Sequence, residues 1–287
     1  MKYAIVCSTS DPASTNIKAN LLTNFDFVET EDKFEDYLIY EFVPKEELFE
    51  KKSPFYDNSI KIYTTDKQLI VFENIDKKID ADIFIFASKH QSTSKVASLT
   101  CHSLGNFNLA LYGGLSNKLV ASNPFFLRSV YLALNKFGAQ SSFERINEAT
   151  HHGPYLEKVG VFVEIGSTQK EWTNKKAGEI LAKSIMEAIK TYSEDALVAL
   201  GFGGLHSCNE FNKVVLRTNV AFCFICPKHN LEFIDEEMLS QMLDKTTKKV
   251  DVAFLDYKGL GRHKNKIISL LENANIKYKK TVDIKNS

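Results

Sequence analysis

Three apolar stretches decide the fold class: DIFIFAS at 82–88, ALVALGF at 196–202 and VAFLD at 252–256. Each stretch is short and continuously apolar, without the polar alternation of a strand that has one face in water. Such runs are typical of strands covered on both faces, as in a sheet between layers of helices. The chain is therefore expected to be an α/β protein.

Segments with helical signals alternate with these strands. One segment begins at Asp11, an expected N-cap followed by a proline at the first helical position. Pro124–Phe137 is followed by a glycine, and Lys170–Tyr192 carries an apolar stripe on one face. Helices alternating with strands predict a three-layer α/β/α sandwich with a mixed sheet.

Residues 31–80 differ from the rest of the chain. They are charged, contain Pro44 and Pro54, and hold short strand-like runs without a strong helical pattern. We expect a smaller β-rich insertion there. Because no linker or internal repeat divides the sequence, residues 1–287 are expected to form a single α/β domain.

The composition excludes several classes of protein. Of the 287 residues, 44% are hydrophobic and 25% are charged, which excludes a disordered or collagen-like chain. The apolar run near the N-terminus is too short for a signal peptide, and no window reaches the ~20 apolar residues of a membrane helix. The five cysteines are odd in number and lie mostly in apolar runs, as is typical of a reducing compartment. We expect a cytoplasmic protein without a membrane partner.

The formal net charge of zero conceals an uneven distribution of charge. Residues 1–50 hold eleven acidic and four basic residues, whereas residues 245–287 hold eleven basic and four acidic ones. Such asymmetry can mark an acidic segment or one that faces a nucleic acid, although lysines that only solvate a terminal helix give the same pattern.

Five of the seven histidines lie in loop-like motifs, most of them directly after predicted strands, where α/β folds bind ligands. The motifs are ASKHQST, LTCHSLGN, THHGP and GFGGLHS, and the histidines are His90, His102, His151, His152 and His206. Imidazole is a common zinc ligand, and catalytic zinc takes three protein ligands, so the set predicts a metal site. Glu148 and Glu164 are the carboxylates available beside it.

Three details of this set stay open. His151 and His152 cannot face the same way in a strand, but a turn before Gly153-Pro154 would relax that limit. Glu164 lies in an apolar strand, where it must be paired or act as a ligand. The glycines of GFGGLHS permit close approach of a phosphate or an oxyanion to the backbone.

A second motif, Cys223-Phe224-Ile225-Cys226, competes with the histidines as a source of chemistry. It can be half a zinc site or a redox pair. It has no second CxxC partner and lies in the core-like run VAFCFICP, where residues three apart face opposite sides of a strand. We favour buried, inert thiols.

As a set, these loops resemble the archaeal-type D-aminoacyl-tRNA deacylases. The resemblance rests on SKH at 88–90, LTCHSLGN at 99–106, THHGP at 150–154, VEIGSTQKEW at 163–172, GFGGLH at 201–206 and DYKGL at 256–260. It implies a phosphorylase/hydrolase-like sandwich and a zinc-dependent enzyme of translation quality control. Such an enzyme hydrolyses the ester between a D-amino acid and the tRNA 3′ end.

The resemblance also implies roles for single residues. The family's histidines fall on His90, His102, His151, His152 and His206, which are the expected ligands, with two zinc ions per chain. We expect His151, His152 and Glu164 to be the catalytic residues, because metal-bound imidazoles usually donate their other N–H to a carboxylate, here that of Glu164 or Glu148. The chain departs from the family pattern after His206, and at Cys223 and Phe224, where relatives carry Gly-His. Whether Cys223 or Cys226 replaces that histidine as a ligand is a hypothesis.

The implied partner is the acceptor end of D-aminoacyl-tRNA, with neither DNA nor a second subunit. Its cationic contact is expected in the basic C-terminal block, at Lys248, Lys249, Lys258, Arg262 and Lys264. Two alternatives remain at this point. One is a zinc-dependent aminopeptidase or amidohydrolase acting on a small substrate, and the other is a catalytically inactive tRNA-binding relative.

Overall fold

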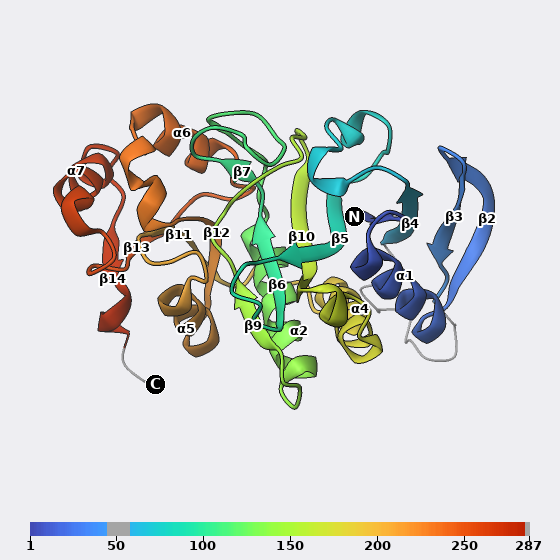
Figure 1. Ribbon diagram of the computed structural model, residues 1–287. Helices are drawn as coiled ribbons and strands as arrows, with labels where there is room; N and C mark the ends of the chain where they lie inside the picture. The colour runs from blue at the N-terminus through green and yellow to red at the C-terminus, as the bar shows by residue number, and fades with distance from the viewer. Residues whose placement is uncertain (45–57, 285–287) are drawn as a thin grey trace.

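A computed structural model describes residues 1–44 and 58–284, which form two main sheets flanked by helices (Figure 1). The larger sheet has eight strands in the order β2-β3-β4-β1-β5-β10-β6-β9. Their bounds are β1 (Lys2–Ser8), β2 (Phe27–Phe34), β3 (Tyr37–Phe42), β4 (Ser59–Thr65), β5 (Ile83–Gln91), β6 (Ser98–Ser103), β9 (Glu144–Asn147) and β10 (Val159–Ser167). Parallel and antiparallel pairs coexist in it, which confirms the predicted mixed α/β class.

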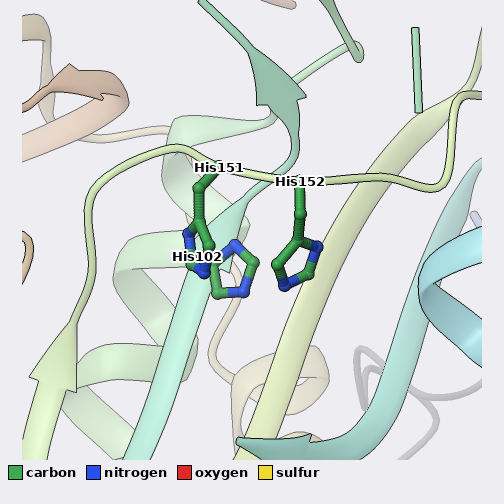
Figure 2. Close-up of side chains that lie close together, drawn as sticks. All are labelled: His102, His151 and His152. Atoms are coloured by element: carbon green, nitrogen blue, oxygen red, sulfur yellow. The ribbon is translucent and has the colours of Figure 1, made fainter. Parts of the chain in front are cut away.

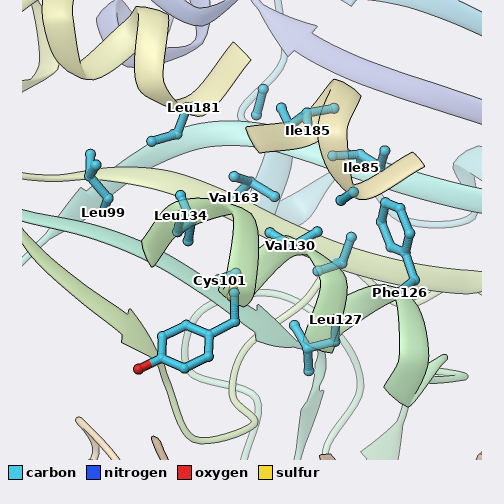
Figure 3. Close-up of a cluster of buried hydrophobic side chains, with 14 of the residues drawn as sticks. Ile85, Leu99, Cys101, Phe126, Leu127, Val130, Leu134, Val163, Leu181 and Ile185 are labelled. Atoms are coloured by element: carbon cyan, nitrogen blue, oxygen red, sulfur yellow. The ribbon is translucent and has the colours of Figure 1, made fainter. Parts of the chain in front are cut away.

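Side chains of the larger sheet alternate between two buried clusters. In β5, Ile83, Ile85 and Ala87 face the helices, whereas Phe84 and Phe86 face the other way. The helical face is covered by α1 (Pro12–Asn24), α2 (Pro124–Gly138) and α4 (Lys175–Lys190), whose apolar side chains pack on the sheet. Figure 3 shows those of α2 and α4. The 3-10 helices η2 (Leu69–Val71) and η3 (Ile75–Lys77), together with loop residues, cover the opposite face.

The smaller sheet is parallel throughout and has the order β12-β11-β13-β14. Its strands are β11 (Leu197–Phe202), β12 (Val220–Cys226), β13 (Val252–Leu255) and β14 (Tyr278–Lys280). Helices α6 (Glu236–Asp244) and α7 (Lys264–Asn273) pack on one face, and α5 (Asn209–Arg217) packs on the other. One buried cluster contains Ile5 of the larger sheet and Phe222 of the smaller one, so the two sheets share a core.

The remaining elements connect these layers. The short strands β7 (Gly105–Asn106) and β8 (Lys118–Leu119) pair with each other and bound a long loop. The other short elements are α3 (Gln169–Trp172), η4 (Lys228–Phe233), η5 (Gly261–His263) and η6 (Thr281–Asp283). No helix in the described ranges is long and apolar enough to cross a membrane.

Several predicted elements have different bounds in the structure. The expected helix Lys170–Tyr192 is divided into α3 and α4, because the Asn174 side chain caps α4 by accepting from the Ala177 N–H. The β-rich segment expected at 31–80 joins the edge of the larger sheet through β3 and β4, and residues 45–57 of that prediction lie outside the described residues.

Candidate metal and catalytic site

The segment after β9 runs along the junction of the two sheets. The Glu148 N–H donates to the Cys101 carbonyl of β6 at 2.9 Å, and the Thr150 N–H donates to the Ile225 carbonyl of β12 at 3.0 Å. Between them, the Ala149 N–H donates to the His206 carbonyl at 3.0 Å. Side chains of this segment therefore meet groups carried by both sheets.

His151 and His152 point into the same space although they are adjacent in sequence (Figure 2). The backbone at His152 has a φ of 42°, in the left-handed region, which removes the alternation of an extended strand. Their ring centroids are 4.3 Å apart, and the centroid of His102 on β6 lies 3.9 Å from His151 and 4.8 Å from His152. The backbone thus adopts the turn that the sequence required for both rings to face one site.

Backbone carbonyls fix the orientation of these three rings. The Nδ1 atoms of His102, His151 and His152 lie 3.1, 2.8 and 2.7 Å from carbonyl oxygens. A ring that donates from Nδ1 keeps the Nε2 lone pair free for a metal ion. The Nε2 atom of His102 is buried and has no hydrogen-bond partner in the described part of the chain. A buried imidazole nitrogen without a hydrogen-bond donor is typical of a histidine that binds a metal ion.

Two buried glutamates stand beside the rings. Glu164 on β10 is 2% exposed, and its Oε2 lies 3.4 Å from Thr100 Oγ1 and 3.5 Å from His102 Nε2. Burial raises the pKa of Glu164, but His102 and His90 outweigh it and hold that pKa well below its usual range. Glu148 is 4% exposed, and there burial dominates and raises the pKa. The buried Glu148 Oε2 also has no hydrogen-bond partner within the described ranges.

The last two histidines of the cluster, His90 and His206, contact the glutamates. His90 lies near the end of β5, with Nδ1 3.5 Å from Glu148 Oε2 and 3.6 Å from Glu164 Oε2. Burial lowers the pKa of His90, but the two glutamates outweigh it and raise it to about 9. His206 follows β11, with Nε2 3.5 Å from Glu148 Oε1 and a side chain 41% exposed. His206 is therefore the part of the cluster that faces solvent.

Within the described residues, three sets of side chains can hold a metal ion, each set having donor atoms within 4.8 Å of one another. The sets are His102, His151 and His152; Glu148, His151 and His206; and His90, Glu148 and Glu164. The structure thus brings together all five histidines and both glutamates singled out in the sequence. His90 and His102 lie inside β5 and β6 and not after strand ends, because β5 is longer than predicted and β6 was not predicted at all.

One aromatic side chain of the site was missed by sequence reasoning. Phe162 stacks on His102 with an interplanar angle of 2° and a centroid distance of 5.4 Å, and its edge meets His152. It lies two residues before Glu164 in β10, so the period-two rule places both on one face of the sheet. The two-residue spacing from Glu164 is the feature of the sequence that could have predicted Phe162 at the site.

The cysteines stay apart from this cluster. Cys223 and Cys226 face the same buried cluster, because the pairing of β11 with β12 shifts register at Ala199/Leu200 and overturns the expected alternation. Their thiols lie near different carbonyls, those of Ala199 and Pro227, and burial raises the pKa of Cys223 to about 12. None of the three metal-competent sets contains a cysteine.

The predicted basic contact is divided between the two ends of β13. Lys248 and Lys249 precede this strand, and Lys248 forms an ion pair with Glu194 at 2.7 Å. The other three, Lys258, Arg262 and Lys264, follow the strand. Because β11 and β13 are parallel, only this second group lies at the edge where β11 leads to His206.

The fold and the site together define an α/β protein whose buried histidine–glutamate centre is suited to a metal ion. The chain belongs to the D-aminoacyl-tRNA deacylase family, whose model matches residues 77–279. It is 34% identical over 262 residues to the D-aminoacyl-tRNA deacylase of Pyrococcus furiosus, covering 89% of this chain and 90% of that one.

Two further comparisons cover almost the whole chain. The D-aminoacyl-tRNA deacylase of Methanosarcina mazei is 31% identical over 296 residues, covering 100% of this chain and 94% of the relative. A crystal structure described as a conserved protein of unknown function matches with a TM-score of 0.85 and 30% identity, covering 99% of this chain and 96% of that one. The predicted family membership is confirmed.

Proposed function

We propose that this protein hydrolyses the ester bond between a D-amino acid and the 3′ end of tRNA, with zinc as its metal. Water and the ester yield free tRNA and the free D-amino acid. The observation that carries the proposal is the cluster of five histidines and two buried glutamates at the junction of the sheets. The relatives named D-aminoacyl-tRNA deacylase supply the reaction.

The donor atoms of the cluster favour zinc among the divalent metals. Imidazole nitrogens with one or two carboxylate oxygens are typical ligands of catalytic zinc, whereas magnesium and calcium prefer oxygen alone. The buried Nε2 of His102 and Oε2 of Glu148, which lack a hydrogen-bond partner among the described residues, fit this donor set. The chemistry that zinc supplies at such a centre is Lewis-acid activation of water at neutral pH.

Two of the three metal-competent sets share no residue, which supports two ions per chain. The set of His102, His151 and His152 is purely imidazole, whereas the set of His90, Glu148 and Glu164 is mainly carboxylate. His206 belongs to neither of these two sets, and with 41% of its side chain exposed it faces the incoming substrate.

The two glutamates orient histidine rings and connect them. Oε2 of Glu164 lies 3.6 Å from His90 Nδ1 and can orient that imidazole by accepting its proton. The same oxygen lies 3.5 Å from His102 Nε2, whose ring donates from Nδ1, so these two acceptors are placed to share a cation. Glu148 links His90 to His206 through its two oxygens. This network offers a proton relay from the buried centre to the exposed ring, where the departing ribose oxygen must gain a proton.

The RNA contact that we propose is the basic group after β13. Lys258 and Arg262 are exposed, and Lys264 lies with its Nζ 4.0 Å from the centre of the Tyr257 ring. The tRNA acceptor end needs only a local cationic surface next to the ester, and this group lies at the His206 edge of the smaller sheet. Lys248 and Lys249 are at the opposite end of β13 and are dropped from the proposed contact.

The test is incubation of the purified protein with D-tyrosyl-tRNA and L-tyrosyl-tRNA, with and without a zinc chelator. We expect release of D-tyrosine only, loss of turnover on chelation, and its return when zinc is added. A stable D-ester with zinc-loaded protein contradicts the proposal. Cleavage of peptides or amides in place of the ester would favour the peptidase alternative.

Single substitutions then test which histidines are required for turnover. His151→Ala and His152→Ala are expected to lower turnover by at least about a hundredfold while the circular dichroism spectrum is unchanged. His229→Ala is the matched control, because His229 belongs to none of the metal-competent sets. Retained turnover in either of the first two variants removes that residue from the site.

A further inference from the structure

The loop between Phe107 and Lys118 presents apolar side chains to solvent. The exposed fractions are 64% for Leu109, 75% for Leu111, 68% for Tyr112 and 48% for Leu115. Single exposed apolar residues are ordinary, but four within seven residues form a patch of the kind that marks a binding surface. The loop residues 107–117 carry no charge. We call these four side chains the apolar loop patch.

The patch is held in place by a hydrogen-bonded base. The Asn106 side chain donates to the Gly113 carbonyl at 3.0 Å, and Glu73 Oε1 accepts from the Gly114 N–H at 2.7 Å. Across the loop, the Ala110 N–H donates to Ser116 Oγ at 3.0 Å. Both glycines have positive φ values, 75° and 79°, which suit a chain bent back on itself. The exposed side chains are therefore presented by an ordered scaffold.

The base of the loop is bonded to the segment that carries the catalytic histidines. The Gly153 N–H donates to the Tyr112 carbonyl at 3.2 Å, and the Gly105 N–H donates to the His152 carbonyl at 2.9 Å. The apolar loop patch thus borders the site on the His152 side. In the described part of the chain, neither a hydrogen bond nor a ring contact engages the Tyr112 phenol.

We infer that Tyr112 and the neighbouring leucines bind the unpaired terminal base at the 3′ end of the RNA, which rests on the proposed function. The reacting ester is attached to the ribose of that base, so the base must lie within one nucleotide of the histidines. Unpaired bases stack on exposed aromatic rings regardless of sequence. An exposed aromatic ring suits a flat base, whereas selection of an amino-acid side chain requires a concave pocket.

The charges around the patch agree with an RNA ligand. The nearby carboxylate of Glu73 is occupied, since its two oxygens accept from the backbone N–H groups of Gly114 and Tyr155. At the end of the loop, Lys118 is exposed and can meet a phosphate. An aromatic ring and a cation on one loop and its flanking strand are the combination found in single-strand binding sites.

The test uses an acceptor-stem hairpin whose terminal adenine is replaced by a fluorescent analogue that is quenched by stacking. Wild-type protein and Tyr112→Phe are expected to quench it, and Tyr112→Ala is expected to quench it far less. For D-tyrosyl-tRNA, Tyr112→Ala is expected to raise KM about tenfold with kcat within about twofold. Leu216→Ala on α5 is the control, because Leu216 is 49% exposed outside the patch.

The outcomes separate this inference from the proposed function. Unchanged quenching and KM in Tyr112→Ala, with turnover intact, overturn the stacking role alone. A change in KM that follows the size of the D-amino acid, with quenching unchanged, would mean that the apolar loop patch binds the amino acid. That result also overturns the stacking role. Quenching that depends on Tyr112 in a protein unable to cleave the ester supports the stacking role and contradicts the proposed function.

Discussion

The Nε2 atom of His102 lies 3.5 Å from Oε2 of Glu164, and the two side chains are only 0% and 3% exposed. The antiparallel pairing of β6 with β10 sets this distance, because it places His102 opposite Phe162 and Thr100 opposite Glu164. The two residues are diagonal neighbours on one face of the sheet. A carboxylate buried there requires a positive or metal-bound partner, which the imidazoles of His102 and His90 supply or help to hold.

Replacing Glu164 by glutamine should weaken the metal centre while preserving its shape. The amide keeps the volume but removes the charge that orients His90 and faces His102 Nε2, so we expect zinc affinity to fall about 10- to 100-fold. A competition titration with a coloured chelator measures this. Glu194→Gln is the control, because Glu194 pairs with Lys248 on the surface. Equal affinities for the two variants would exclude an orienting role of Glu164.

The thiols should be inert in the folded protein. All five cysteines are buried, and burial raises the pKa of Cys7 and Cys223 to about 12, so almost no thiolate forms at pH 7. We expect a thiol-specific reagent to label the native protein negligibly and the unfolded protein at five sites. The Cys223→Ser/Cys226→Ser variant should keep its zinc content. Loss of zinc from that variant would revive the hypothesis of a cysteine ligand.

Two charge-reversal variants test which part of the basic C-terminal block contacts the RNA. Reversing Lys258, Arg262 and Lys264 should flatten the dependence of kcat/KM on salt, because each lost phosphate contact lowers the slope of log affinity against log salt by about 0.7 to 0.9. Reversing Lys248 and Lys249 should leave this slope unchanged. The opposite pattern would place the RNA at the other end of β13.

The shared core should be sensitive to loss of volume at α2. Phe126, which Figure 3 shows within the cluster of buried side chains, is 0% exposed. Its ring centroid lies 5.6 Å from that of Tyr3 on β1. Phe126→Ala is expected to lower the free energy of unfolding by about 3 to 5 kcal/mol in a denaturant titration. Leu216→Ala, at a surface position, should change it by less than about 0.5 kcal/mol. A small effect at Phe126 would mean that the cavity is refilled by its neighbours.

Local patterns predicted most of the buried strands correctly. The runs around β5, β11 and β13 are continuously apolar because both of their faces are covered, and that property is visible in the sequence. By contrast, β6 was missed, since Ser98, Thr100 and His102 give it a polar alternation on the side that faces the site. A strand that lines a polar centre does not have the pattern of a core strand.

The sequence by itself determined the α/β class, the family and the residues able to bind a metal, because these follow from apolar runs and from chemically distinctive motifs. Only the tertiary structure decided which of these residues meet. The left-handed backbone at His152 turns two adjacent rings to one side, and the antiparallel register of β6 brings His102 to Glu164. The basic block was divided for the same reason, since β13 separates Lys248 from Lys258. Contacts between distant segments depend on register and packing, which no local pattern records.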